Sequence, residues 1–148
     1  MNDKARAALP NLVAWLGYGG LIPFLVTALG ARLDGARSLF WSHALVCYGA
    51  CIVSFLGALY WGFAMTLPGI GPRSQQALFL GSVVPALIAW IALLLPDSPA
   101  LVLLVMTLGV LLWSEWRLVG VLALPSWYLP LRLKLTAAAV CLLSAAIF

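Results

Sequence analysis

Five long apolar runs alternate with short polar segments along the chain. Each run has few charged residues and about 20 or more positions, which is the length that a helix needs to cross a bilayer. The runs cover residues 10–31, 39–67, 76–95, 99–122 and 130–148. The pattern therefore predicts an all-α fold, in which a bundle of five transmembrane helices forms one domain over residues 1–148.

The composition favours a membrane protein over a soluble one. The chain has 148 residues, of which 65% are hydrophobic and 8% are charged, whereas soluble domains carry about 25% charged residues. The net charge is +4, but the basic residues are too few and too scattered to form a stripe that binds nucleic-acid phosphates. The expected partner is therefore the lipid bilayer, and nucleic acid is excluded.

The basic residues also predict the orientation in the membrane. The segments between the runs are assigned alternately to the two sides of the membrane. The side of the N-terminus then receives Lys4, Arg6, Arg73, Arg117, Arg132 and Lys134, and the other side receives Arg32 and Arg37. The side richer in Lys and Arg is usually the cytoplasmic one. We predict a cytoplasmic N-terminus and a multi-pass protein of the bacterial inner membrane.

The first apolar run contains the helix-breaking stretch "LGYGGLIPF". Pro23 cannot donate a backbone hydrogen bond to the carbonyl of Gly19, and Gly17 and Gly20 let the chain bend there. We expect a break near the middle of this helix, and Pro85 in the third run is a second candidate for a kink. Two interpretations remain open. The break lines a small-molecule or ion site, or the glycines only allow close helix packing.

The second apolar run carries a face of polar, small and aromatic residues. At 3.6 residues per turn, this face is formed by His43, Cys47, Ala50, Ser54, Gly57 and Trp61. Residues at such spacings share one side of a helix. We expect this side to point into the bundle, toward the first helix.

The cysteines raise the question of a metal site. His43, Cys47 and Cys51 follow one another at steps of four residues, and imidazole and thiolate are metal ligands. A fourth ligand would have to come from another helix, so we predict no metal. Together with Cys141, these cysteines are expected to be reduced and to act as small buried hydrophobes.

Glu115 is the one acidic residue in the interior of an apolar run. The fifth predicted helix runs antiparallel beside the fourth and brings Arg132 and Lys134 close to it, whereas Arg117 points to nearly the opposite side. An ionisable residue inside a membrane is costly and suggests a function. We expect an ion pair that fastens the two helices, with Arg132 or Lys134 as the partner.

Enzyme signatures are lacking. The sequence has no glycine-rich phosphate loop, no HExxH and no GxSxG. With one histidine and few carboxylates, it offers few groups for general acid–base chemistry.

Three stretches, "LGYGGLIPF", "YGACIVSFLGALYWGFA" and "WYLPLRLKLT", resemble in the same order the motifs of domain-of-unknown-function family 3429. The resemblance covers nearly the whole chain. It implies a small integral membrane protein, in a family with bacterial members and a eukaryotic, mitochondrial one, and it supplies no activity. The matching positions worth testing are Gly17, Gly20, Pro23, Ser54, Phe55, Gly57, Trp61, Gly62, Trp127, Tyr128, Arg132 and Thr136.

We hypothesise a non-enzymatic protein that binds a small apolar or amphipathic ligand between the first helix and the polar face of the second. The predicted ligand-binding residues are Gly17, Gly20, Pro23, His43, Ser54, Gly57 and Trp61. The Glu115–Arg132 pair would close the inner end of this site. The alternatives are a structural or assembly factor for a larger membrane complex, with a membrane protein as partner, and a minimal transporter. Whether the protein has a cofactor, and which one, is unknown from the sequence.

Overall fold

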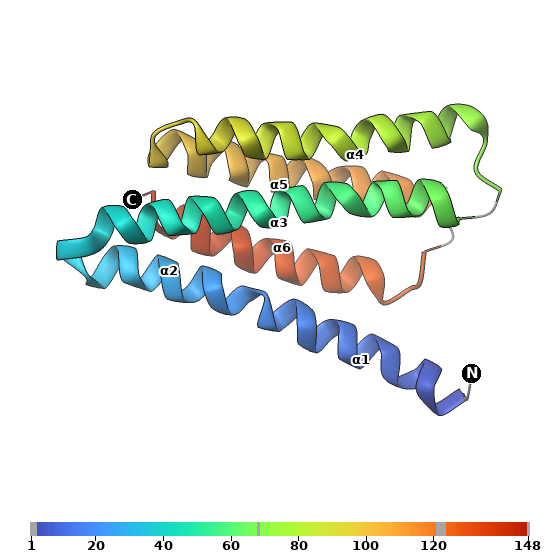
Figure 1. The fold of residues 1–148 in the computed structure, drawn as a ribbon. Helices are drawn as coiled ribbons and strands as arrows, with labels where there is room; N and C mark the ends of the chain where they lie inside the picture. The colour runs from blue at the N-terminus through green and yellow to red at the C-terminus, as the bar shows by residue number, and fades with distance from the viewer. Residues whose placement is uncertain (1–2, 68, 121–123, 148) are drawn as a thin grey trace.

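The computed structural model describes residues 3–67, 69–120 and 124–147, with side chains from residue 11 onward. Every regular element in these residues is a helix (Figure 1). The elements are α1 (Asp3–Gly19), α2 (Leu21–Leu33), η1 (Gly35–Arg37), α3 (Ser38–Thr66), α4 (Pro72–Leu93), α5 (Asp97–Val119) and α6 (Tyr128–Ala145). The predicted all-α fold class is confirmed.

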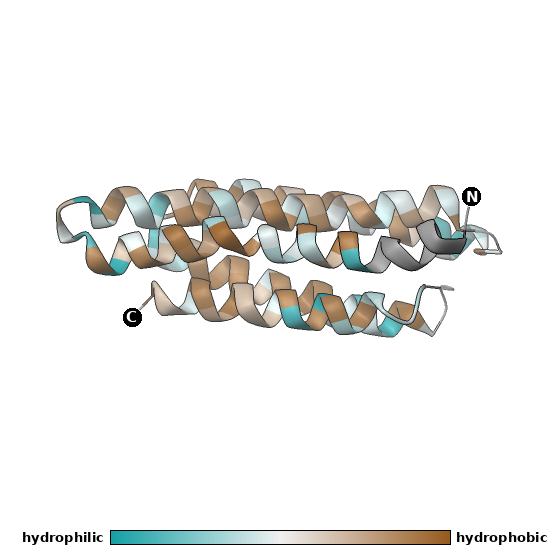
Figure 2. Ribbon diagram, turned by 90° about the horizontal axis from the view of Figure 1, so that it is seen from below, coloured by the Kyte–Doolittle hydropathy of each residue, from teal (hydrophilic) through white to brown (hydrophobic). Residues whose placement is uncertain are grey.

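Five segments of the described chain are long and apolar enough to cross a membrane. The first, Asn11–Leu33, combines α1 with α2 and is called the first span below, and α3 to α6 contribute the other four. Hydrophobic residues cover most of the length of these helices (Figure 2). The prediction of five transmembrane helices is confirmed. The helix ends predicted at residues 122 and 148 lie outside the described residues.

α3 lies at the centre of the bundle. It packs against α2, α4 and α5, and α6 lies against α2 and α5 (Figure 1). Its buried residues follow one another at steps of three and four, so they form one broad side of the helix that meets these neighbours. They are Leu45, Val46, Gly49, Ala50, Val53, Leu56, Gly57, Tyr60 and Ala64.

The predicted break in the first span is present at Gly20, between the end of α1 and the start of α2. Gly20 keeps right-handed helical angles, with φ −65° and ψ −15°, so the chain bends there and does not reverse. The Tyr48 hydroxyl donates a 2.7 Å hydrogen bond to the Gly20 carbonyl, and the Thr27 hydroxyl donates one of 2.7 Å to the carbonyl of Pro23. Backbone carbonyls near the break therefore have partners inside the protein, as a low-dielectric membrane requires.

The α3–α4 interface is closely packed. A Cβ atom added at Gly57 would lie 2.9 Å from Pro85 Cβ and 2.9 Å from the Ser82 carbonyl oxygen. α4 continues through Pro85 to Leu93 without a break. Gly57 thus lets the backbones of two helices approach, which is the usual use of small residues between membrane helices.

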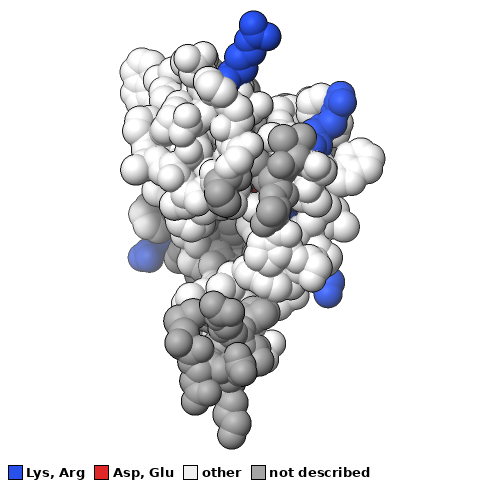
Figure 3. Space-filling model, turned by 90° about the vertical axis from the view of Figure 1, so that its right-hand side faces the viewer, with Lys and Arg blue, Asp and Glu red and all other residues white. Residues whose placement is uncertain are grey.

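The two ends of the bundle differ in charge. One end gathers the beginnings of α4 and α6 and the ends of α3 and α5, and cationic side chains stand at its rim (Figure 3). At the opposite end, Arg32 donates a 2.7 Å hydrogen bond through Nε to the carbonyl of Ala145, near the end of α6. A cation is favourable there because the carbonyls at a helix C-terminus carry partial negative charge.

Candidate functional site

A cavity of about 390 Å³ lies between the first span, α3 and α6. We call it the α6 cavity. Gly17, Gly20 and Phe24 border it from the first span, and Leu56 and Leu59 border it from α3. Its walls are mostly apolar, and the polar side chains that line it belong to α6 and to Trp127 just before α6. Cavities that hold small molecules are typically about 300–1,000 Å³ and apolar, with a few polar groups that orient the ligand.

α6 contributes a polar stripe to this cavity. Tyr128, Arg132 and Thr136 all line it. They follow one another at steps of four residues, which places them on the same side of the helix. The stripe begins in the first turn of α6, at the end of the bundle where the cationic side chains stand.

The charge of Arg132 is neutralised within the bundle. Its Nε donates to Glu115 Oε2 and its Nη2 donates to Glu115 Oε1, each at 2.8 Å. Both side chains are buried, with 9% of Arg132 and 1% of Glu115 exposed. This two-point geometry is the strong form of an arginine–carboxylate pair. The structure thus brings the predicted partners together and fastens α5 to α6, while Lys134 is exposed.

Two hydroxyl groups on the stripe form no hydrogen bond of ordinary length. Tyr128 Oη and Thr136 Oγ1 are both buried and have no partner within hydrogen-bonding distance among the described residues, although the Tyr128 hydroxyl lies close to the polar atoms of Arg132 and Glu115. Buried polar atoms in proteins are nearly always hydrogen-bonded. Both oxygens belong to residues that line the α6 cavity, so the two exceptions occur at the same place.

The other threonines and tyrosines in the spans show how unusual this is. Each of the remaining threonines donates at 2.7 Å to the carbonyl four residues back, as Thr27, Thr66 and Thr107 do. This is the common arrangement for a hydroxyl inside a helix. The Tyr60 hydroxyl bonds to the carbonyl of Leu111 at 3.2 Å. Thr136 departs from this arrangement although it lies well inside α6.

A second hollow lies between α4 and α5. This groove has a volume of about 720 Å³ and is lined mainly by apolar residues. Arg117 lies at its edge, with its guanidinium carbon 4.8 Å from the centre of the Trp113 ring. The hydroxyl of Thr107, which also lines the groove, already has a partner. Unlike the α6 cavity, the groove has no unpaired buried side-chain atom among the described residues.

Sequence comparison places the chain in a family. Residues 9–148 match the family described as "Protein of unknown function (DUF3429)". The chain belongs to the DUF3429 family. It is 41% identical over 140 residues to transmembrane protein 69 of Xenopus tropicalis, covering 93% of this chain and 54% of that protein. It is 30% identical over 130 residues to transmembrane protein 69 of Mus musculus, covering 86% of this chain and 51% of that protein.

This DUF3429 chain spans about half the length of the curated relatives it matches. No solved structure matches it. The family resemblance seen in the three sequence motifs is therefore confirmed, together with the assignment as a multi-pass membrane protein. The family description names no activity.

In this DUF3429 protein, only some of the predicted ligand-binding residues line the α6 cavity. Gly17 and Gly20 line the α6 cavity. Pro23 lies near the break in the first span and lines neither the α6 cavity nor the groove between α4 and α5. The expected position of the site was wrong, because the predicted face of α3 does not meet the first span. Gly57 on that face packs against Pro85 of α4.

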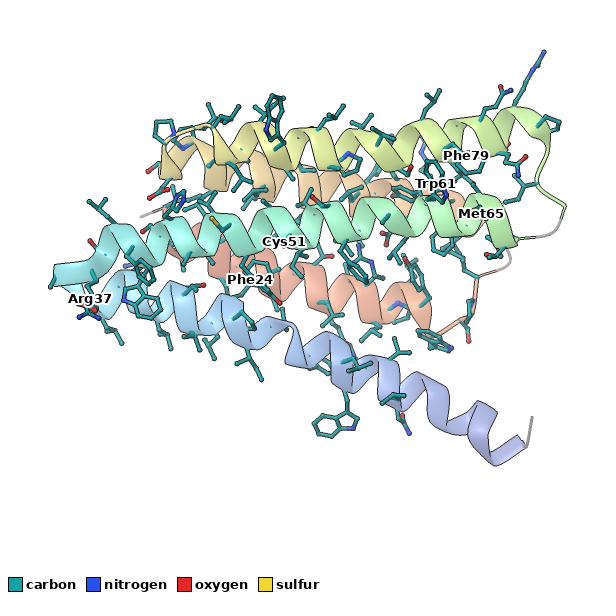
Figure 4. The ribbon with its side chains drawn as sticks, viewed as in Figure 1. Phe24, Arg37, Cys51, Trp61, Met65 and Phe79 are labelled. Atoms are coloured by element: carbon teal, nitrogen blue, oxygen red, sulfur yellow. The ribbon has the colours of Figure 1, made fainter. Side chains whose placement is uncertain are left out.

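Trp61 and His43 illustrate the same correction at either end of α3. The Trp61 ring is 4.9 Å from the Phe79 ring of α4, its Nε1 is 3.0 Å from Met65 Sδ, and 48% of the residue is exposed (Figure 4). His43 Nδ1 lies 3.3 Å from Asp97 Oδ1 of α5, on a mostly exposed side chain. Ser54 is half-buried and lines neither hollow.

The cysteines are also placed differently from the expectation. Cys47, Cys51 and Cys141 are free, but Cys51 and Cys141 are exposed and only Cys47 is partly buried. The prediction that they act as small buried hydrophobes was wrong for those two, because their sides of α3 and α6 face outward. Within the described residues, no group of three potential ligands could hold a metal ion.

Tyr128 and Thr136 are the site residues that chemical reasoning from the sequence passed over. The family resemblance marked both positions, but the motif search for catalytic or metal-binding residues did not. The spacing of Tyr128, Arg132 and Thr136 was the available signal, since four-residue steps align side chains along one side of a helix. What the spacing does not reveal is that two of these groups lack partners.

Proposed function

We propose that this membrane protein binds a small amphipathic molecule within its helix bundle and is not an enzyme. The proposed site is the α6 cavity. The observation that carries the proposal is the pair of unpartnered buried hydroxyls, Tyr128 Oη and Thr136 Oγ1, on either side of Arg132. Leaving a buried hydroxyl such as that of Thr136 without a partner costs about 1–3 kcal/mol. A bound polar group that supplies the missing hydrogen bonds accounts for their placement.

The shape and packing of the site support the same proposal. The apolar walls suit a hydrocarbon portion, and the stripe on α6 suits a polar head. Both hydroxyl oxygens are closed to solvent, so a ligand atom must displace neighbouring apolar atoms to reach them. The first span makes this possible, because only 17% of its most apolar window is buried, against 44% for α3.

Identification of co-purified molecules tests the proposal directly. The protein is purified in a mild detergent, and bound small molecules are identified by mass spectrometry. We expect a molecule with one apolar and one polar portion at about one per chain. Val13→Trp should abolish its retention, because Val13 lines the cavity and is 39% exposed, which leaves room for a larger ring.

Val84→Trp is the matched control. Val84 is 51% exposed and lines the groove between α4 and α5 instead. This variant should retain the molecule like the parent protein. Equal retention by both variants, or a folded preparation that carries no such molecule, would contradict the proposal.

A structural or assembly role is the second candidate, and the sparse packing of the first span favours it. Large apolar side chains on this span are exposed, among them Trp15, Leu16 and Ile22. A membrane protein partner could cover them. Stable co-purification of one partner that is lost when Trp15 and Ile22 are replaced by Ala, with an empty α6 cavity, would favour this role over ligand binding.

We further propose that the protein resides in a bacterial inner membrane with its N-terminus in the cytoplasm. The excess of Lys and Arg on one side supports the orientation, whereas the relatives identified above come from vertebrates. Reporters would test the orientation. One is fused to the N-terminus, one is placed in the connection between α2 and α3, and one in the connection between α3 and α4. A periplasmic N-terminus would overturn the orientation.

A further inference from the structure

We infer that the head of the bound molecule is an uncharged hydrogen-bond acceptor, such as an ester or ketone carbonyl, and not a carboxylate, sulfonate or phosphate. This inference rests on the proposed function and specifies the class of ligand. It follows from the donors on the α6 stripe and from the charge of the site.

The stripe is rich in hydrogen-bond donors. The Arg132 guanidinium can only donate, and its contacts with Glu115 use Nε and Nη2, so Nη1 is not engaged by that carboxylate, while the Tyr128 hydroxyl lies close to the guanidinium. The hydroxyls of Tyr128 and Thr136 can both donate and accept. An acceptor is the one type of group that all three residues can serve. A carbonyl oxygen has two lone pairs and can accept from two of these donors at once.

The charge of the site argues against an anion. Arg132 is the one charged residue that lines the α6 cavity within the described chain. Its charge is already matched by Glu115 in a buried pair. A ligand anion would therefore add an unmatched negative charge to a low-dielectric interior. Attraction to Arg132 would not offset this cost, because the charge of Arg132 is already paired with that of Glu115. An uncharged head adds no net charge.

The hydrocarbon portion of the ligand has a defined place. From the stripe, the cavity extends along the first span past Gly17 and Gly20 to Phe24. Phe24 is 1% exposed and its ring lies 4.8 Å from that of Tyr48, so it forms a closed apolar end. The polar head therefore lies near the α6 start and the apolar portion points toward the middle of the membrane.

A matched series of photoreactive probes tests the inference on the full chain in neutral detergent. Each probe has the same 12-carbon chain with the same diazirine, and carries a methyl ester, a permanently charged sulfonate or no head group. Cross-linked peptides are mapped and quantified by mass spectrometry. We expect the ester to label cavity residues severalfold more than the hydrocarbon, and the sulfonate to label them least.

Variants of two threonines show whether the polar stripe on α6 recognises the head group of the probe. Thr136→Val removes the unpartnered hydroxyl with little change in shape and should lower ester labelling about fivefold, the typical value of one hydrogen bond. Thr136→Ser keeps a hydroxyl and should retain the labelling. Thr107→Val is the control, because its hydroxyl is bonded to the Leu103 carbonyl and lies outside the α6 cavity. It should leave ester labelling unchanged.

The outcomes separate the inference from the proposed function. Stronger labelling by the sulfonate would overturn the uncharged head and leave binding in the cavity intact. Equal labelling by the ester and the hydrocarbon, or an unchanged Thr136→Val, would overturn recognition of the head by the stripe. Labelling confined to residues outside the cavity for all three probes would contradict the proposed function itself.

Discussion

The first span and α3 are equally apolar, but the bundle uses them in different ways. Their most apolar windows have the same mean hydropathy, yet 17% of the first is buried inside the protein against 44% of the second. Hydropathy brings both helices into the membrane, where lipid is as apolar as a helix surface. Close contact between helices depends instead on complementary shapes. α3 has such contacts with several neighbours, and the first span leaves a cavity beside α6.

Glycines on the two helices show the physical basis of this difference. A Cβ atom at Gly57 of α3 would meet backbone and ring atoms of α4, which have no room to move. A Cβ atom at Gly17 of α1 would meet Leu135 Cδ1 at 2.6 Å. Leu135 is a flexible side chain that itself borders the cavity. The same kind of close approach is therefore rigid on one side of the bundle and adaptable on the other.

The largest effect is expected at the Glu115–Arg132 ion pair, which joins α5 to α6 beside the α6 cavity. Glu115→Gln leaves the buried Arg132 cation without its counter-charge, which costs about 3–5 kcal/mol. Thermal unfolding in detergent should show a clearly lower midpoint. Arg117→Gln, which removes an exposed cation stacked on Trp113, serves as the control and should change the midpoint little. An unchanged midpoint for Glu115→Gln would contradict a stabilising ion pair.

An intermediate effect is expected in the rigid region. Gly57→Ala should destabilise the protein by about 1–3 kcal/mol, since neither Pro85 nor the Ser82 carbonyl can move aside without separating α3 from α4. Gly62→Ala, in the same helix with no atom within 4 Å of the added carbon, should be neutral or slightly stabilising because alanine favours helix. Both are measured by thermal unfolding. Equal midpoints for the two variants would show that the interface tolerates a wider spacing.

The smallest effect is expected in the adaptable region. Gly17→Ala should cost about 1 kcal/mol or less, because Leu135 can rotate into the cavity instead of forcing the helices apart. Gly19→Ala, with open space around the added carbon, is its control. The same unfolding assay applies. If Gly17→Ala were as damaging as Gly57→Ala, the contrast between the two regions would be lost.

The sequence predicts the fold well because membrane insertion depends on features visible one helix at a time. Length and hydropathy identify the spans, and Pro23 with its neighbouring glycines identifies the break. Antiparallel neighbours also follow from short connections, which is why Glu115 could be matched with the start of the fifth predicted helix before its partner was known to be Arg132.

The position of the candidate site could not be predicted in the same way. α3 is apolar on nearly all sides, so polarity does not determine which side meets which neighbour. The polar residues His43 and Ser54 suggested that their side of α3 faces the first helix, whereas the fit of Gly57, on the same side, against Pro85 turns it toward α4. Thr136 is a further case, because its missing partner depends on a side-chain rotation that only the three-dimensional packing determines.

The hydrogen bond between Tyr48 and Gly20 marks the point where the first span changes from a part packed against α3 to a part that leaves it. Beyond the bond, α2 is held against α3, while α1 runs outward from the bundle (Figure 1). Gly20 is thus anchored to α3, and the end of α1 borders the cavity. The ligand proposed above would then enter sideways from one leaflet, past α1, and would not have to cross water.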